Sequence, residues 1–172
     1  RQQRPHDKKK KTVVIVGANF SGLAALWKLE KSEDLNILVI DKNEYFEYTP
    51  GVLRLFCNPK LFTSLAKALQ SKQHKFLQGT VTSITKTSLL YTTGREVKPL
   101  SFDYLILATG TAYTHPITAG TSETTLAERE TSWKIAHQKL NAAKRILILG
   151  GGAVGVELAA EIVDHYDHDT HV

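Results

Sequence analysis

The pattern of apolar and polar residues divides most of the chain into short segments of strand and helix type. Residues 12–16 and 36–40 are apolar runs rich in β-branched residues, which predict two buried strands. Leucines recur at helical spacing over residues 20–30, which predicts a helix packed on the sheet. A further apolar run at residues 104–108 predicts a third buried strand. Strands that alternate with helices favour an α/β fold around a parallel sheet.

Smaller elements are predicted between the second and third of these strands. Residues 61–70 follow Pro59 with a short amphipathic helical pattern, and residues 74–85 alternate like a strand. Residues 88–100 have Gly94 at a turn, which predicts a hairpin.

The C-terminal part repeats the pattern of strand and helix. Residues 125–143 have helical periodicity and many charges, so we expect a solvated connecting helix anchored by Trp133 and Ile135. We then expect a strand at residues 145–149 and a helix at residues 154–163.

Two glycine-rich turns are the strongest candidates for chemistry. The stretch VVIVGANFSG covers residues 13–22, and ILILGGGAVGVELAAEI covers residues 146–162. Each passes from an apolar strand through glycines into a helix. Such a turn can press against a pyrophosphate while the helix N-terminus points its N–H groups at it. One such motif is weak, but two in one chain predict two dinucleotide sites.

The first motif reads Gly17-x-Asn19-x-x-Gly22, so asparagine stands where the pattern has its middle glycine. Asparagine tolerates left-handed φ better than most residues, and we expect the turn to survive with this side chain turned aside. Asp41 ends the second predicted strand, where a dinucleotide fold places the acid that binds the adenosine ribose.

Composition narrows the class of protein further. The 172 residues are 42% hydrophobic, which is enough for a core, and they contain no apolar run of membrane-spanning length and no signal-peptide pattern. The net charge is +5, and much of it lies in the first eleven residues, which predicts a solvated basic tail and argues against nucleic acid as a partner. Methionine is absent even at position 1, so we expect the native start to be missing.

The segment DKNEYFEYTPGVLR, residues 41–54, resembles the one that follows the ribose acid in two groups of flavoproteins. An aromatic residue before Thr-Pro is similar to type II NADH dehydrogenases. The triplet Val52-Leu53-Arg54 is similar to the apoptosis-inducing-factor-like proteins that include the ferroptosis suppressor. The stretch ATG at residues 108–110 resembles the second FAD signature of flavoproteins with two dinucleotide-binding domains, within the pyridine nucleotide-disulphide oxidoreductase superfamily. This resemblance covers nearly all of the chain and about the first half of such an enzyme.

The resemblance implies a Rossmann-type FAD-binding domain followed by the start of a second Rossmann-type domain for NAD(P)H. Thr49 and Pro50 would lie near the flavin ring, and Val81 would lie against the adenine. Glu157 would lie where the nicotinamide stacks on the flavin, in a catalytic or proton-relay role or in a structural one. The residues expected to bind FAD are Gly17, Ala18, Asn19, Phe20, Ser21, Gly22, Asp41, Lys42, Thr49, Pro50, Arg54, Val81, Ala108, Thr109 and Gly110. Those expected to bind NAD(P)H are Gly150, Gly151, Gly152, Ala153, Val154, Gly155 and Glu157.

The activity implied by the resemblance is hydride transfer from NAD(P)H to the flavin, with electrons passed on to a quinone or a similar acceptor. Two alternatives stay open: a ferredoxin- or rubredoxin-type reductase, and an apoptosis-inducing-factor-like flavoprotein associated with nucleic acid. We expect the chain itself to be an inactive fragment, because the strand that selects NADH over NADPH and the family's C-terminal FAD segment are absent. We also expect its C-terminal strand and helix to dock on another chain or on a complementary fragment.

Cysteine and histidine give no further site. Cys57 is the only cysteine, which excludes a disulfide framework and a CxxC centre within this chain, and we interpret it as a packed thiol. His165, His168 and His171 recur at three-residue spacing among acids. We expect a histidine-rich turn there and no metal site, because strand residues at this spacing point to different faces.

The expected domain organisation has four parts. A basic tail at residues 1–11 precedes the first segment of the FAD-binding domain at residues 12–120. A connecting helix at residues 121–143 leads to the truncated start of the NAD(P)H-binding domain at residues 144–172. We expect an intracellular protein, cytoplasmic or mitochondrial, for which peripheral association with a membrane stays open.

Overall fold

The computed structural model describes residues 9–70 and 74–166. The chain divides into two compact units, one drawn from residues 1–44 and 69–111 and the other from residues 45–68 and 112–172. The domain boundaries expected from the sequence stay a prediction.

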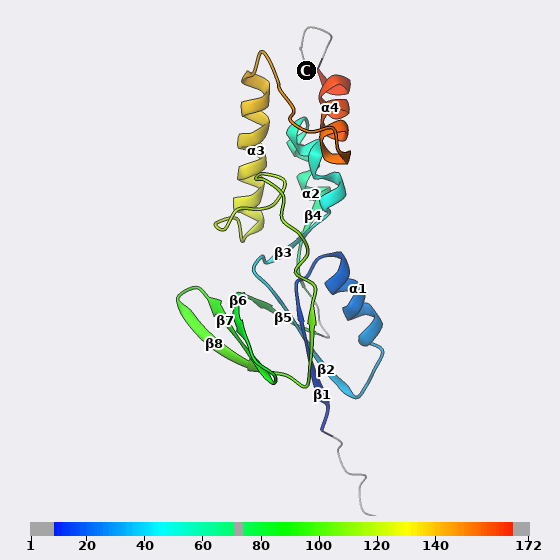
Figure 1. The fold of residues 1–172 in the computed structure, drawn as a ribbon, viewed down its shortest axis with the longest axis vertical. Helices are drawn as coiled ribbons and strands as arrows, with labels where there is room; N and C mark the ends of the chain where they lie inside the picture. The colour runs from blue at the N-terminus through cyan, green and yellow to red at the C-terminus, as the bar shows by residue number, and fades with distance from the viewer. Residues whose placement is uncertain (1–8, 71–73, 167–172) are drawn as a thin grey trace, which may run out of the picture. The chain divides into compact units, whose positions relative to one another are not determined.

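A parallel sheet of four strands, in the order β5-β2-β1-β9, is the centre of the first unit (Figure 1). Its strands are β1 (Lys11–Val16), β2 (Leu35–Asp41), β5 (Lys75–Gln78) and β9 (Tyr104–Leu107). In the sheet, Val13 pairs with Ile37 on one side and with Tyr104 on the other. The predicted strands at residues 12–16 and 36–40 are confirmed, and so is the α/β fold with a parallel sheet.

Both faces of this sheet are covered, which explains why its central strands each contain four consecutive buried apolar residues, Val13–Val16 and Ile37–Ile40. Helix α1 (Phe20–Leu29) packs Leu26 on the face formed by Val13, Ile15 and Val39. The opposite face, which includes Val14 and Ile40, packs against Leu89 and Tyr91 of a second, antiparallel sheet. That sheet has the order β6-β7-β8, with β6 (Thr80–Ile84), β7 (Ser88–Thr93) and β8 (Glu96–Ser101). The predicted helix at residues 20–30 and the hairpin at residues 88–100 are therefore confirmed.

Two expectations for the first unit need correction. The alternating stretch at residues 74–85 is two strands, β5 and β6, in different sheets. They separate at Gly79, where a Cβ atom would lie 2.6 Å from a ring carbon of Tyr91. The strand at residues 104–108 is present as β9, but it is not buried, because it is the edge strand of the sheet: Tyr104 is 58% exposed and Leu107 is 59% exposed.

The second unit combines helices with one short antiparallel pair of strands. Its elements are β3 (Tyr45–Glu47), the 3-10 helices η1 (Thr49–Phe56) and η2 (Pro59–Leu61), α2 (Phe62–Leu65), β4 (Ala66–Ala68), α3 (Leu126–Ala142) and α4 (Ala153–His165). Strands β3 and β4 pair with each other. Val52 and Leu55 of η1 pack with Phe62 and with Trp133 of α3, so η1 lies at the centre of this core.

The predictions for the second unit are confirmed in part. The connecting helix at residues 125–143 and the helix at residues 154–163 are present as α3 and α4. The helix expected at residues 61–70 is wrong, because only Phe62–Leu65 is α-helical and the chain then turns into β4 to pair with β3.

The strand expected at residues 145–149 does not form within the described part of the chain, where Leu147 is 82% exposed and Leu149 is 87% exposed. A strand needs hydrogen bonds from a neighbouring strand. In α3, Trp133 is fully buried, but Ile135 is not an anchor because it is 46% exposed. Two residues along an α-helix point to nearly opposite sides, so these two side chains do not share a buried face.

None of the helices in the described residues is long and apolar enough to cross a membrane.

Candidate functional site

The first glycine-rich turn is tight enough to require glycine at both of its outer motif positions. Gly17 has a φ of +104°, a conformation that L side chains rarely adopt. A Cβ atom on Gly17 would lie 2.2 Å from the carbonyl oxygen of Ala108, and one on Gly22 would lie 1.8 Å from the carbonyl oxygen of Gly17. Glycine at these positions therefore lets the turn pack on the Ala108 backbone and close on itself directly before the N-terminus of α1, which is where a pyrophosphate-binding turn lies.

The predicted ribose acid lies directly at this turn. One carboxylate oxygen of Asp41, Oδ2, accepts a hydrogen bond from the backbone N–H of Ala18 at 2.7 Å, and Oδ1 accepts one from the N–H of Asn43 at 2.8 Å. The N–H of Gly79 donates to the Asp41 carbonyl at 2.8 Å. A carboxylate oxygen can accept more than one hydrogen bond, so both retain capacity for a ribose hydroxyl.

Asn19 has a different role from the one expected. The turn forms as expected, but not through a left-handed asparagine, because the φ of Asn19 is −103° and its ψ is −158°, which is extended backbone. Asn19 is the N-cap of α1, and its side-chain oxygen accepts a hydrogen bond from the N–H of Phe20 at 2.9 Å. The asparagine therefore helps to begin the helix. The two residues after it, Phe20 and Ser21, are exposed in the first turn of α1.

The segment at residues 108–110 meets the same turn from β9. The N–H of Ala108 donates to the carbonyl of Val16 at 2.8 Å, and Gly110 has a φ of +70°. Val81 in β6 packs partly buried against the apolar cluster that contains Val16. The first unit thus brings together the glycine turn, Asp41 and residues 108–110. Lys42 is exposed beside Asp41.

Thr49, Pro50 and Arg54 belong to the second unit, on η1. Thr49 and Pro50 begin this helix, directly after Tyr48, whose N–H donates to the Leu65 carbonyl at 2.7 Å. The side chain of Arg54 is exposed, and its Nε lies 3.6 Å from Oε1 of Glu161 in α4.

The second glycine-rich turn repeats the geometry of the first. Gly150 has a φ of +112°, and a Cβ atom on Gly155 would lie 2.0 Å from the Gly150 carbonyl oxygen. Gly152 is the N-cap of α4, and Glu157 is exposed on that helix. The remaining predicted residues, Gly151, Ala153 and Val154, lie in or directly before the first turn of α4. The positions of the motif glycines are therefore the same in relation to both helices.

Cys57 is buried, as predicted, and its thiol donates a weak hydrogen bond to the Glu161 carbonyl at 3.5 Å. Burial, and then the charge of Glu161, raises the pKa of this thiol to about 11, so it is protonated at neutral pH. His165 ends α4, whereas His168 and His171 lie outside the described residues. In the part of the chain that is described, no group of three or more His, Cys, Asp or Glu side chains is placed to hold a metal ion.

A buried ion network in the second unit was not predicted from the sequence. The guanidinium of Arg129 in α3 is fully buried, and it pairs with Glu47 at 2.8 Å and with Glu123 at 2.8 Å. Burial lowers the pKa of Arg129, but hydrogen bonds to Glu47 and Glu123 outweigh it and raise the pKa above its ordinary value. The sequence places this arginine in a highly charged helix, and its one signal is Trp133 four residues later, on the same helix face.

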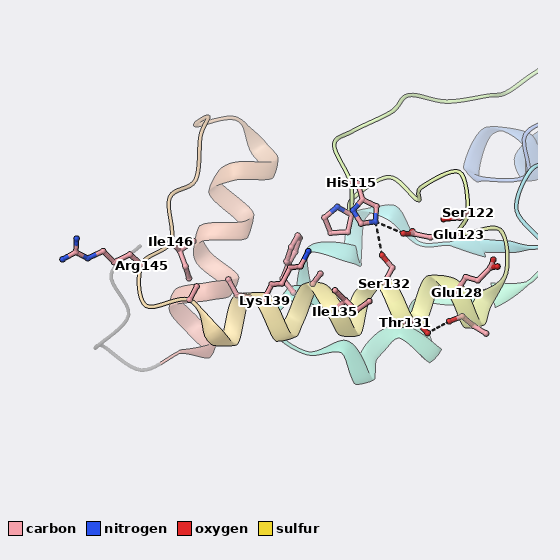
Figure 2. Close-up of a pocket in the computed structure, with 16 residues that line it drawn as sticks. His115, Ser122, Glu123, Glu128, Thr131, Ser132, Ile135, Lys139, Arg145 and Ile146 are labelled. Carbon is pink, nitrogen blue, oxygen red and sulfur yellow. Dashed lines mark hydrogen bonds and ion pairs between the residues drawn. The ribbon is translucent and has the colours of Figure 1, made fainter.

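The network extends from Glu123 to His115, whose side chain is 54% exposed, and from there to Ser132 (Figure 2). Oε1 of Glu123 lies 2.6 Å from Nε2 of His115, and that nitrogen lies 3.0 Å from Oγ of Ser132. Burial raises the pKa of Glu123, but hydrogen bonds from Ser132, His115, Arg129 and the N–H of Gly120 together lower it to about 2.

His115 and Ser132 also line a cavity of about 980 Å³ along α3, beside Ile135 and Lys139 (Figure 2). Its volume would accommodate a small ligand. However, none of its lining residues is among the predicted cofactor-binding residues, so it is not the nucleotide site expected from the sequence.

Comparison with known proteins gives consistent matches. Residues 11–172 match the family model described as "Pyridine nucleotide-disulphide oxidoreductase". The chain is 34% identical over 161 residues to apoptosis-inducing factor homolog B of Dictyostelium discoideum, covering 91% of this chain and 40% of that protein. It is 31% identical over 157 residues to ferroptosis suppressor protein 1 of Xenopus laevis, covering 90% of this chain and 41% of that protein.

Among solved structures, the chain is similar to NDH2 of Plasmodium falciparum in complex with NADH. The TM-score is 0.66 at 20% identity, covering 91% of this chain and 37% of that one. At this identity the likeness shows the fold, which confirms the predicted Rossmann-type architecture.

The chain spans about two fifths of the length of the curated relatives that it matches, 40% and 41% in the two named above. The family match, in contrast, runs from residue 11 to residue 172, nearly the whole sequence. The chain therefore belongs to the pyridine nucleotide-disulphide oxidoreductases, a family of NAD(P)H-dependent flavoprotein oxidoreductases, and its family uses the cofactors predicted from the sequence, FAD and NAD(P)H.

Proposed function

We propose that this chain is the nucleotide-binding part of an FAD-dependent enzyme that oxidises NAD(P)H and passes the electrons to a quinone or a similar small acceptor. The observation that carries the proposal is the repetition of one turn geometry at two places. The first glycines have φ of +104° and +112°, and Cβ atoms on the third glycines would lie 1.8 Å and 2.0 Å from the first glycines' carbonyl oxygens. Two such turns provide for two dinucleotides.

The first turn fits the FAD pyrophosphate. Gly17 lets the turn pack closely against Ala108, because a Cβ atom there would lie 2.2 Å from the Ala108 carbonyl oxygen. The turn leads directly into α1, and the N-terminus of a helix attracts a phosphate through its dipole. Asp41 is fixed at the same turn by its hydrogen bonds with Ala18 and Asn43, so that its carboxylate can accept hydrogen bonds from the ribose.

The family resemblance supports the remaining FAD contacts. Thr49, Pro50 and Arg54 would contact the flavin half of the cofactor, Val81 the adenine, and residues 108–110 the pyrophosphate. When bound, FAD supplies the hydride acceptor at its N5 atom and the route by which two electrons reach the acceptor. The chain's own residues would bind and orient the two cofactors.

The second turn would hold NAD(P)H at the N-terminus of α4. Residues 150–155 would approach its pyrophosphate, and Glu157 would lie near the nicotinamide. The exposed position of Glu157 on α4 is compatible with a contact to this ligand.

The quinone acceptor rests on the resemblance of residues 41–54 to type II NADH dehydrogenases and to the ferroptosis suppressor. The intracellular location, peripheral association with a membrane and docking of the C-terminal part on another chain stay predictions. The prediction that the C-terminal part docks on another chain is supported by its exposed apolar side chains, because such side chains favour a partner surface. They are Leu147, Leu149, Val156 and Val163.

Gly17→Val in the full-length protein tests the proposal, with Gly94→Val as a matched control. Both glycines have positive φ in the first unit, but a Cβ atom on Gly94 has nothing within 4 Å. We expect the Gly17→Val protein to lack the visible absorption of bound flavin. It should therefore also lack the second signal, which is the reoxidation of NADH-reduced flavin by a quinone analogue. Gly94→Val should retain both, and circular dichroism should show that both variants fold. Full flavin occupancy in the Gly17→Val protein would contradict the assignment.

A further inference from the structure

We propose that Arg129 and Trp133 of α3 are positioning residues, which hold Glu47 and through it the orientation of the segment Thr49–Pro50 that faces the flavin. This inference rests on the proposed function, because that function assigns Thr49 and Pro50 to the flavin. All of the contacts that carry it lie within the second unit.

Both carboxylate oxygens of Glu47 are held by α3. Nε of Arg129 donates to Oε1 at 2.8 Å and Nη2 donates to Oε2 at 2.9 Å, which is the two-point fork that arginine forms with a carboxylate. Nε1 of Trp133 donates to Oε1 at 3.0 Å. Glu47 is 8% exposed, and Arg129 and Trp133 are fully buried, so little water competes for these bonds.

Glu47 is connected directly to the flavin-facing segment. It is the last residue of β3, and its carbonyl accepts a hydrogen bond from Oγ1 of Thr49 at 3.4 Å. Between them, the N–H of Tyr48 donates to the Leu65 carbonyl at 2.7 Å, and the Tyr48 carbonyl accepts from the N–H of Gly51 at 2.9 Å. A shift of the Glu47 side chain would therefore move the backbone from which Thr49 and Pro50 project.

The same helix also holds the far end of η1. The rings of Trp133 and Phe56 meet edge to face with centroids 5.4 Å apart. Nδ1 of His137 lies 2.8 Å from the Phe56 carbonyl, as a donor to it. Helix α3 thus fixes η1 before its first residue and at its last residue, with Trp133 taking part at both ends.

The ion pair between Arg129 and Glu47 is better suited to positioning the Glu47 carboxylate than to stabilising the fold. A buried ion pair gains little over apolar side chains of similar volume, because removing both charges from water costs as much as their attraction returns. The planar fork of arginine instead fixes the direction of the carboxylate that it binds. A displacement of about 1 Å near the reacting groups can slow an enzyme about 100-fold, so a fixed Thr49–Pro50 segment has a direct consequence for flavin reduction.

Three variants of the full-length protein separate positioning from general stability. Glu47→Gln removes one of the two acceptor oxygens, and Trp133→Phe removes the indole N–H while retaining a ring. The matched control is Glu123→Gln, because Glu123 also pairs with Arg129, at 2.8 Å, but lies on a different segment from η1. The first measurement is amide hydrogen exchange at Tyr48 and Gly51 in protein without cofactor. The second is the visible absorption spectrum and the midpoint potential of bound flavin.

We expect Glu47→Gln and Trp133→Phe to speed exchange at Tyr48 and Gly51 about tenfold or more and to shift the flavin bands and potential, while Glu123→Gln leaves all of these near wild type. Unchanged exchange in Glu47→Gln would overturn the inference, and so would an equal effect of Glu123→Gln. Faster exchange with an unaltered flavin would also overturn it, because η1 would then move without consequence for the cofactor. If the proposed function itself is wrong, the result is different, because the wild-type protein then binds no flavin at all.

Discussion

Glu123 shows how strongly single residues in the buried network are coupled to their surroundings. Its hydrogen bonds outweigh burial and lower the pKa of its carboxyl from the usual 4.5 to about 2 in the folded protein. Below pH 4.5 the unfolded chain binds a proton that the folded chain still excludes. The stability that this carboxylate contributes is therefore fully present above about pH 4.5 and is lost as the pH falls through about 2.

We predict that Glu123→Gln removes this part of the pH dependence. Each unit of pKa shift corresponds to about 1.4 kcal/mol. Between pH 7 and pH 2 the free energy of unfolding should therefore fall by about 3 kcal/mol more in wild type than in Glu123→Gln. Urea unfolding of both proteins at several pH values between 7 and 2 measures the difference. Parallel curves for the two proteins would show that Glu123 does not have the lowered pKa.

At the scale of residues, the sequence predicted the parts of the site that depend on local backbone geometry. Gly17, Gly22 and Asp41 follow a spacing that the turn itself imposes, and the structure places them together. Arg129 and Glu47 could not be predicted, because they lie 82 residues apart along the chain and look like ordinary surface charges in their own segments.

At the scale of elements, Asn19 is better understood as part of α1 than as a departure from a motif. It caps the helix through the N–H of Phe20. We predict that Asn19→Ala lowers the free energy of unfolding by about 1 kcal/mol, whereas Asn19→Gly lowers it by only a few tenths, because glycine is itself an acceptable N-cap. Thermal and urea unfolding of the two variants measure these losses, and equal losses would show that Asn19 does not act as a cap.

Two kinds of helix and strand were predicted well from the sequence. Some pair or pack with a segment that is near in sequence, and others have a long stretch of regular apolar and polar spacing. The first strand, α1, the second strand and α3 are examples. The segment at residues 61–70 was mistaken for one helix because pairing of Ala66–Ala68 with β3 overrides its helical pattern. The segment at residues 145–149 has a strand-like composition, but composition cannot supply the neighbouring strand that it needs.

At the scale of the whole molecule, the chain enters the second compact unit twice, at residues 45–68 and again from residue 112. Periodicity and motifs are read in order along the chain, so they do not reveal which distant segments share a core. The consecutive domain boundaries expected from them stay a prediction. Trp133 is an example, since its partners in the core include Val52 and Leu55 of η1.

We propose that the chain binds two different dinucleotides, one at each glycine-rich turn. Anaerobic titration of the full-length holoprotein with NADH and NADPH, followed by flavin absorption, tests this most directly when Gly155→Val is compared with Gly94→Val. A Cβ atom on Gly155 would clash with the Gly150 carbonyl, whereas one on Gly94, which is outside both proposed cofactor sites, has nothing within 4 Å. We predict that wild type and Gly94→Val bleach with a reduced nicotinamide, and that Gly155→Val retains its flavin but does not bleach. Bleaching of Gly155→Val at the wild-type rate and nucleotide concentration would contradict the account.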